Sequence, residues 1–395
     1  MKSIDELIKD LNLNEELVEI RRDFHKHPEL SGNEYMTMDK ICQHLDKWGI
    51  KYTKGVADTG VVAIIEGASS GKTIGLRGDI DALPIEEENK NTPYCSQNLG
   101  VMHACGHDAH ITILLGVAKV LKELEGELKG NVKFFFQPAE ETTGGAYRMI
   151  QAGCLENPHV DYVLGLHVEP KYAVGQVGIR YGKMYASSDM ITIKINGKSA
   201  HGAHPDEGID AIIVAANILN TLQTIVSRNV GPTNSAVCTF GTIHGGRVRN
   251  QIADYVELEG ILRTLDPKTR MFAREKVRKI CEQVADSMGA KAELIIDESY
   301  SPLINNDEVV DIVYKNAQNI LGKENVILED TPDLSTEDFS YFAAERKACY
   351  FHLGCSSAKS DTVVDLHNSG FDIDERCLTV GVKLQVKNIL SLLEK

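Results

Sequence analysis

The chain is organised around residues 102–110, which read Met-His-Ala-Cys-Gly-His-Asp-Ala-His. Cysteine and histidine are the side chains that best bind borderline-soft metal ions. Cys105 and His107 are two positions apart, so an extended backbone directs both side chains to one side. Gly106 lets the backbone approach an ion, and the apolar run after His110 is typical of a buried helix. The stretch predicts a metal-binding turn that leads into a helix; the alternative is a loop that is merely rich in histidine.

Composition limits the classes of function. The 395 residues suggest two or three domains, and a hydrophobic share of 43% is enough for a large core. The net charge of −15 argues against a nucleic-acid partner. We find no apolar run long enough to span a bilayer and no apolar signal core at the N-terminus. Nine cysteines without a close C-x-x-C pair predict free thiols and a cytoplasmic location.

Apolar strands alternate with helices in the first part of the chain, and polar side chains follow three of the strands. The predicted strands are 61–65, 73–77, 132–136 and 162–166, with a hairpin turn at 69–71. In open α/β sheets the site lies at the carboxyl ends of the strands. Here those ends carry Asp79 and Asp81, Glu140 and Glu141, and His167. We therefore expect an α/β domain whose site collects these groups.

From Lys183 the pattern changes. Ile191, Ile193 and Ile195 alternate as in a half-buried strand, and the segments that follow read as helix, strand, strand, helix and strand. This β-α-β-β-α-β order is the ferredoxin-like unit. We expect residues 183–297 to be an inserted α+β domain, with residues 1–182 and 298–395 forming the first domain.

Soft, borderline and hard ligands occur together, enough for two metal ions. The candidates are Cys105, His107, Glu141, His167 and His367. Paired metals suit hydrolysis, because they polarise a carbonyl and lower the pKa of a water molecule. Glu140 would then serve as general base, and Asp81 would orient a ligand. Taken singly, the glutamate pair could be solvated and His167 a satisfied buried histidine; only the joint pattern indicates a site.

The inserted domain contributes three candidates. His201, in the run Gly197–Pro205, could reach a substrate carbonyl oxygen, although the simpler interpretation of the run is a plain strand-to-helix loop. Asn250 and Arg263 could bind a substrate carboxylate, with the arginine in a bidentate grip. His25 and His27 end a helix and are interpreted as partners of its dipole or of solvent rather than as ligands.

The motifs together resemble one family in its own order along almost the whole chain. They include Arg77-Gly78-Asp79-Ile80-Asp81, His103 to Asp108, Gln137 to Glu141, Gly197 to Pro205, and His367-Asn368. The chain resembles the amidohydrolase branch of the di-metal aminoacylase/carboxypeptidase family, which includes hippurate hydrolases, auxin-conjugate hydrolases and N-acetyldiaminopimelate deacetylases.

The resemblance implies a metal-bearing catalytic domain with an inserted lid domain that dimerises. It implies the same five ligands, with Glu140 as base and His201 acting on a neighbouring subunit's site. We therefore expect a homodimer that carries two divalent ions, zinc or manganese, per subunit. The expected reaction splits an N-acyl-L-amino acid into a carboxylic acid and a free amino acid. The alternatives are a dipeptidase or carboxypeptidase, an N-acetyldiaminopimelate-type deacetylase, and a metal-binding scaffold without turnover, against which Glu140 argues.

Overall fold

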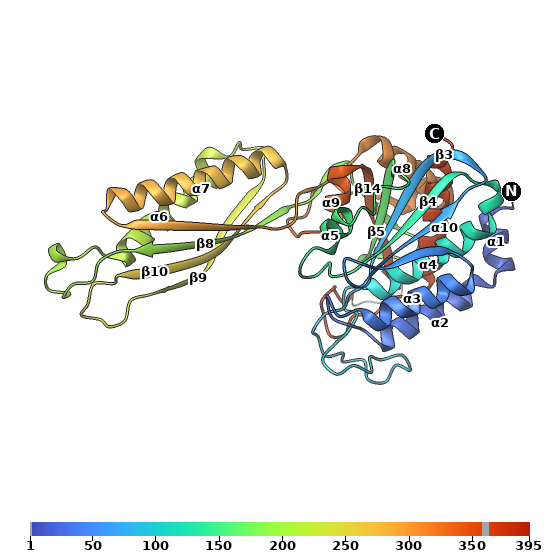
Figure 1. The fold of residues 1–395 in the computed structure, drawn as a ribbon, viewed down its shortest axis with the longest axis horizontal. Coiled ribbons are helices and arrows are strands. Elements are labelled where there is room, and N and C mark those ends of the chain that lie inside the picture. Colours follow the sequence, from blue (N-terminus) through green and yellow to red (C-terminus); the bar gives the residue numbers. More distant parts are fainter. Residues whose placement is uncertain (1, 358–362) are drawn as a thin grey trace. The chain divides into compact units, whose positions relative to one another are not determined.

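The computed structural model describes residues 2–357 and 363–395, and the chain divides into two compact units (Figure 1). The first unit comprises Met1–Gly182, Asn305–Asp330 and Tyr341–Lys395, and the second comprises Lys183–Ile304 and Thr331–Ser340. The segment Thr331–Ser340 follows the inserted region in sequence but groups with it in space.

The first unit is built on an eight-stranded mixed sheet in the order β1-β2-β4-β3-β5-β14-β6-β13. Within it β3 runs parallel to β4 and β5, and β5 runs parallel to β14. These four strands therefore end at one edge, as a parallel α/β sheet requires for a shared site. The strands are β1 (Lys51–Val56), β2 (Gly60–Glu66), β3 (Ser69–Asp79), β4 (Lys129–Gln137), β5 (Tyr162–Ala173), β6 (Val177–Ile179), β13 (Val326–Leu328) and β14 (Lys347–Ser356).

Helices cover both faces of this sheet because its central strands are apolar on both sides. Phe134 and Phe136 of β4 belong to the main core, whereas Phe135 faces the other way and stacks on Phe342 with ring centroids 5.3 Å apart. The helices are α1 (Ile4–Asp10), α2 (Leu13–Lys26), α3 (Tyr35–Lys47), α4 (His107–Glu123), α5 (Gly145–Gln151), α8 (Asp307–Leu321), α9 (Ser340–Glu345) and α10 (Arg376–Leu393). Helix α4 is buried almost throughout, as the apolar run after His110 predicts.

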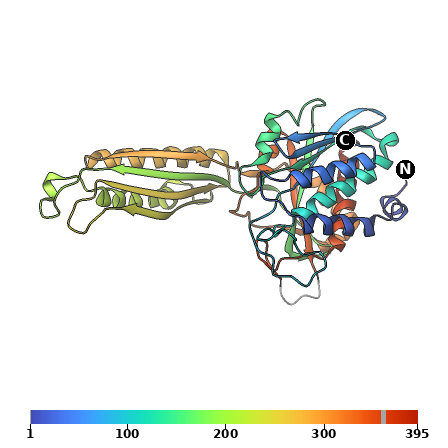
Figure 2. The same cartoon turned by 60° about the horizontal axis from the view of Figure 1, so that its bottom comes forward.

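The second unit is an antiparallel four-stranded sheet in the order β11-β8-β10-β9, with α6 and α7 on one face (Figures 1 and 2). This strand order confirms the predicted ferredoxin-like arrangement. Ile191, Ile193 and Ile195 all point into the core beneath the helices. The elements are β8 (Ser187–Asn196), α6 (Ala211–Thr224), β9 (Ala236–Gly245), β10 (Tyr255–Thr264), α7 (Pro267–Ser287) and β11 (Lys291–Glu298). A separate two-stranded sheet pairs β7 (Gly182–Tyr185) with β12 (Leu303–Asn305).

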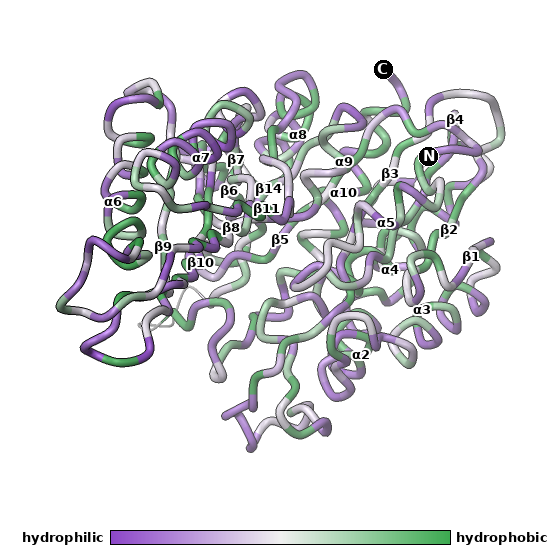
Figure 3. The backbone as a smooth tube through the Cα atoms, turned by 60° about the vertical axis from the view of Figure 1, so that its left-hand side comes forward, coloured by the Kyte–Doolittle hydropathy of each residue, from purple (hydrophilic) through white to green (hydrophobic). Residues whose placement is uncertain are grey.

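Three local expectations were wrong. Residues 69–71 do not form a hairpin turn, because β4 lies between β2 and β3 and Ser69 already begins β3. Strand β5 does not end at Leu166 but continues to Ala173. The sequence was also expected to hold no apolar run long enough to span a bilayer. One helical stretch of the described chain, Ala211–Asn229, meets that test by length and composition alone, and 33% of it is buried. Figure 3 shows hydrophobic turns along α6, which accounts for most of this stretch.

Candidate metal centre

The carboxyl ends of β3, β4 and β5 bring the predicted groups to one edge of the sheet. Asp79 pairs with Gln137 in the β3–β4 register, so Glu140 and Glu141 follow directly beyond Asp79. Leu76 pairs with Leu164, which sets His167 level with Asp79 although β5 runs on past it. His167, although it lies within β5, is therefore at the same edge of the sheet as the residues that follow the ends of β3 and β4.

The five predicted ligands converge around the Cys105 thiol. Its Sγ lies 3.4 Å from His167 Nε2 and 3.2 Å from His367 Nε2. Glu141 Oε1 lies 3.3 Å from His367 Nε2 and 3.8 Å from His107 Nε2. Soft sulfur, imidazole nitrogen and carboxylate oxygen thus face one another from four separate segments of the chain.

Two atoms at the centre of this cluster have no hydrogen-bond partner. His107 Nε2 and Glu141 Oε1 are buried and make no hydrogen bond with the residues that the structure describes, although they lie within ion-pair distance of each other. Leaving a buried polar atom unpaired costs roughly 1–3 kcal/mol, so native structures rarely do it without a ligand or ion. The donor set is one that divalent ions accept, and the cluster therefore fits a metal centre.

The turn that carries Cys105 and His107 depends on Gly106. Its φ is +80°, a left-handed conformation, and a Cβ there would meet Val168 Cγ2 of β5 at 2.4 Å. The backbone must therefore pack directly against the strand that supplies His167. Helix α4 begins at His107, immediately after this turn.

Asp81 fixes the ring of His107. His107 Nδ1 lies 2.9 Å from the Asp81 carbonyl oxygen and 3.2 Å from Asp81 Oδ1, so it carries the proton and leaves Nε2 as the ligating atom. Burial alone would raise the pKa of Asp81, but hydrogen bonds from His107, from Ser31 Oγ and from the Glu141 amide lower it. Asp81 therefore stays ionised in the interior.

The negative surroundings favour a cation. Burial alone would lower the pKa of His107, but Asp79, Asp81 and Glu141 raise it to about 10. Burial and the nearby Glu141 and Glu140 raise the pKa of the Cys105 thiol well above its usual value. Because both groups must lose a proton to ligate, metal binding there releases protons.

His167 is held neutral. Its Nδ1 donates to the Val168 carbonyl oxygen over 2.7 Å, which leaves Nε2 facing Cys105. Burial, together with the nearby His110 and His107, lowers the pKa of His167 well below its usual value. The ring is therefore ready to ligate without first losing a proton.

Glu140 lies beside these atoms and is itself 8% exposed. A carboxylate oxygen of Glu140 and one of Glu141 both lie within 4.8 Å of a His107 ring nitrogen and of each other. Ala139, just before Glu140, has a φ of +52°, and its amide donates to Glu34 Oε1 over 2.9 Å. A non-glycine residue with positive φ persists only where the surroundings impose it. Buried Glu34 is thus a support of the Glu140 turn that sequence reasoning missed.

His110 is a second support that the sequence analysis did not assign. Its Nδ1 lies 2.5 Å from Asp79 Oδ1, and its Nε2 accepts from the Val168 amide over 2.9 Å. Both ring nitrogens are therefore occupied, so His110 braces β3 against β5 rather than ligating. Arg77 Nη1 donates to Asp79 Oδ2 over 2.6 Å and completes the brace. The sequence did offer one sign of this role: His110 follows His107 by three residues, which places both on one face of α4.

The three candidates of the second unit lie on two adjoining turns and one strand. His201 and Asn250 are exposed on adjoining turns, where the Gly202 amide donates to the Asn250 carbonyl oxygen over 2.8 Å. Arg263 lies in β10 with its Nη1 buried and without a hydrogen-bond partner in the described part of the chain. Burial lowers the pKa of Arg263.

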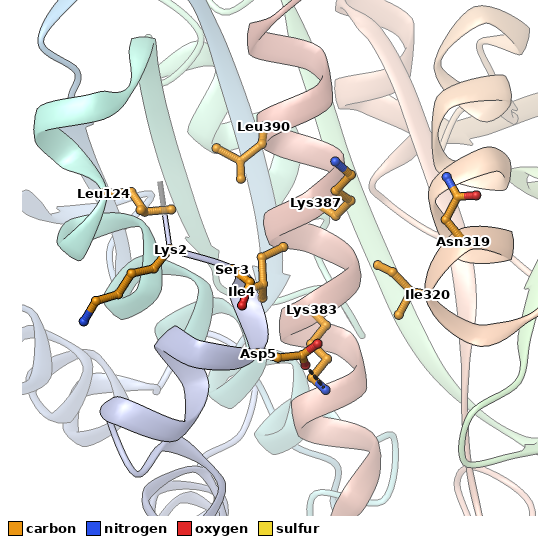
Figure 4. Close-up of a pocket in the computed structure, with 10 residues that line it drawn as sticks. All are labelled: Lys2, Ser3, Ile4, Asp5, Leu124, Asn319, Ile320, Lys383, Lys387 and Leu390. Carbon is orange, nitrogen blue, oxygen red and sulfur yellow. Dashed lines mark ion pairs between the residues drawn. The ribbon is translucent and has the colours of Figure 1, made fainter.

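The first unit also contains a cavity of about 500 Å³ between α1, α8 and α10 (Figure 4). Lys2, Lys383 and Lys387 line it, and Asp5 forms an ion pair with Lys383 over 2.5 Å. No predicted site residue is among its described lining residues, so this cavity is separate from the metal centre.

Comparison with known proteins shows the family of the chain. The profile of Peptidase family M20/M25/M40 matches residues 75–391. N-acetyl-L-cysteine deacetylase from Bacillus subtilis is 40% identical over 366 residues, covering 93% of this chain and 85% of the relative. Thermostable carboxypeptidase 1 from Saccharolobus solfataricus is 37% identical over 386 residues, covering 96% of each.

A solved structure agrees over the whole fold. YxeP from Bacillus subtilis, described as a dinuclear metal-binding peptidase of family M20, superposes with a TM-score of 0.83 at 33% identity. The match covers 97% of this chain and 99% of YxeP. The chain therefore belongs to Peptidase family M20/M25/M40, and it is a metal-dependent hydrolase of amide bonds.

Proposed function

We propose that the protein hydrolyses N-acyl-L-amino acids to a carboxylic acid and a free amino acid. The observation that carries the proposal is that two buried atoms without a hydrogen-bond partner, His107 Nε2 and Glu141 Oε1, lie beside the carboxylate of Glu140. A binding scaffold needs ligands alone, whereas hydrolysis also needs a base next to them.

In the proposed site Cys105, His107, Glu141, His167 and His367 hold two divalent ions. Such a pair polarises the amide carbonyl and lowers the pKa of the attacking water. Cysteine favours zinc, and the remaining ligands accept zinc or manganese. Asp81 keeps the His107 ring in the ligating tautomer through the contacts described above.

Glu140 carries the proton in both halves of the reaction. It accepts a proton from the water as the oxygen attacks the amide carbon, and it returns that proton to the leaving nitrogen as the C–N bond breaks. His201 donates a hydrogen bond to the carbonyl oxygen as negative charge develops there. Arg263 is proposed to bind the substrate carboxylate, for which its Nη1, without a hydrogen-bond partner in the described residues, offers a donor. Asn250 lies beside His201, beyond the opposite end of β10, and is proposed to contact the substrate where His201 does.

The proposed assembly is a homodimer joined through the second unit. Strand β9 lies at the edge of its sheet and is mostly exposed, so its backbone is open to pairing with a second copy. Ile212 and Ile213 of α6 are 46% and 50% exposed, and Ile243 of β9 is 54% exposed. A two-fold contact through β9 and α6 would cover all three and would let each His201 serve the partner's metal centre.

We propose a cytoplasmic location. All nine cysteines are free and eight of them are buried, as expected for a protein folded in a reducing compartment.

A second candidate reaction is removal of a C-terminal amino acid from small peptides. The carboxypeptidase relative supports it, and the same base and ligands would perform it. The deciding experiment is a panel of N-acetyl and N-benzoyl amino acids beside dipeptides, each assayed for amine release with zinc and with manganese. The proposal expects the N-acyl amino acids to give the higher kcat/KM. Turnover confined to dipeptides would establish the peptidase instead.

A further inference from the structure

Arg21 is the largest fully buried side chain of the protein and lies on a helix that supplies no proposed ligand. It sits at 0% exposure in α2, near the N-terminus of the chain. A buried guanidinium is retained only where carboxylates surround it, because its desolvation is otherwise too costly. The carboxylates that contact Arg21 therefore indicate its structural role.

One end of the guanidinium reaches the His107 turn. Arg21 Nε donates to Asp108 Oδ2 over 2.7 Å, and Asp108 directly follows the proposed ligand His107. The same carboxylate is fixed on its other side, since Oδ1 accepts from the Ala109 amide over 2.9 Å. His25, one turn along α2 from Arg21, lies with Nδ1 2.7 Å from Asp108 Oδ2. Asp108 is thus held by α2 and in turn holds the first turn of α4.

The other end reaches the His367 turn. Arg21 Nη2 donates to Asp372 Oδ1 over 2.8 Å, five residues after the proposed ligand His367. His367 has a φ of +61°, and its amide donates to the Ala104 carbonyl oxygen over 2.8 Å. Phe371, next to Asp372, donates its amide to the Asn368 carbonyl oxygen, which closes the turn. One planar side chain therefore spans the two segments that carry His107 and His367.

The residues that contact Arg21 also hold the loop segment between Leu83 and Met102. Tyr94 donates its hydroxyl to Asp372 Oδ2 over 2.7 Å, and its ring centroid lies 5.1 Å from the Arg21 guanidinium carbon. Glu87 Oε1 lies 3.4 Å from His25 Nε2, and its Oε2 accepts from the Ser96 amide. This loop segment is therefore anchored to Asp372 and His25, which also contact Arg21.

We propose that Arg21 is a positioning residue that holds the His107 turn and the His367 turn in one ligand arrangement. It acts through Asp108 and Asp372, and it touches neither the proposed ligands nor a substrate. The rigid fork is essential, because a single ammonium cannot meet two carboxylates on different segments with the same geometry. The inference rests on the proposed ligation by His107 and His367.

The test compares Arg21→Lys with Arg22→Lys on the full chain. Arg22 is the neighbouring control: its side chain is 41% exposed, and it donates to both oxygens of Glu375 over 2.8 and 2.7 Å. Affinity for zinc and for manganese is measured by competition with a chelator, and the cobalt-substituted proteins are compared by visible absorption. The Arg21→Lys protein should bind metal about 10- to 100-fold more weakly and show shifted cobalt bands, as expected when a partner of a ligand segment is lost. The Arg22→Lys protein should match the wild type.

Asp372→Asn is the second variant, and it approaches the same contact from the exposed side. It should weaken metal binding in the same direction while the metal-free protein unfolds near the wild-type temperature. Wild-type metal affinity and cobalt bands in both Arg21→Lys and Asp372→Asn would show that Arg21 only stabilises the fold, and would overturn the proposal. His107→Ala separates the proposed ligation by His107 from the proposed role of Arg21. If this variant keeps its metals, the ligand assignment fails whatever the Arg21 variants show.

Discussion

Asp81 contacts His107 twice, through its backbone carbonyl oxygen at 2.9 Å and its side-chain Oδ1 at 3.2 Å from the same ring nitrogen. The backbone contact fixes the tautomer, and the side chain adds a buried negative charge behind the ring. The two contacts can be separated by substitution, because only the second depends on the residue type. The geometry therefore distinguishes the orientation of His107 from its electrostatic support.

Asp81→Asn should keep both metals and lower kcat by about 10- to 100-fold, because the charge behind His107 is lost while the carbonyl contact remains. Metal content by elemental analysis and kcat on an N-acyl amino acid test this. Ser31→Ala removes one hydrogen bond to Asp81 Oδ2 and should have a smaller effect. Complete loss of metal in Asp81→Asn would mean that the side chain, not the carbonyl, holds the ring.

Glu140→Gln should abolish turnover and leave the metals in place, because Glu140 is proposed as the base and not as a ligand. Metal analysis and a single-turnover assay on the same preparation decide it. Glu141→Gln is the control, since the neighbouring carboxylate is a proposed ligand and its loss should reduce metal content. A Glu140→Gln protein that lacks metal would contradict the division of roles.

Cys105→Ser should weaken metal binding, because an alcohol is a poor ligand unless it is deprotonated. Cys349→Ser is a control: Cys349 is also buried, but it lies in β14 and outside the ligand cluster. The control should cost packing energy without changing metal stoichiometry. If Cys105→Ser retains both metal and activity, the thiol belongs to the core and not to the metal centre.

His201→Ala and Glu140→Ala chains should complement each other if His201 acts on the partner's site. Each homodimer should be nearly inactive, whereas dissociation and reassembly of a mixture should restore partial activity through one competent site per heterodimer. The readout is amine release, with wild-type protein taken through the same treatment. Heterodimers that remain inactive while the wild type recovers would place His201 in its own chain's site or outside catalysis.

Glu329 should contribute stability that is lost in acid. Burial alone would raise its pKa, but hydrogen bonds from His352 and Tyr172 and the charge of Lys171 lower it from 4.5 to about 2. The folded-state pKa is below the unfolded one, so the contribution is complete above pH 4.5 and disappears as the pH falls towards 2.

Urea unfolding of the wild type and of Glu329→Gln between pH 7 and pH 3 measures this contribution. Because the carboxylate is partly open to solvent, we expect a difference in unfolding free energy on the order of 1 kcal/mol at pH 7. That difference should shrink as the pH falls. A difference that stays constant across this range would show that Glu329 titrates normally.

The sequence predicted which polar groups gather in the candidate site, because these residues follow strong local patterns. Polar groups after apolar strands located Asp81, Glu140 and Glu141, and the alternation of Ile191, Ile193 and Ile195 located the inserted sheet.

Tertiary partners could not be predicted in this way. His25 was interpreted as a partner of solvent or of the helix dipole, yet it is buried against Asp108, a residue 83 positions away. Arg21, Glu34 and His110 each act on segments distant in sequence. No local pattern identifies these contacts, because they depend on which strands become neighbours in the sheet.

The wide separation of the ligand segments sets the order of assembly. Cys105 and His367 lie 262 positions apart, and their side chains approach only after β5, β14 and the C-terminal turn have docked. An unfolded chain would have to close very long loops to offer the same donors, so it presents no comparable site to an ion. We therefore expect metal to bind chiefly to the folded domain and, by mass action, to draw the population toward it.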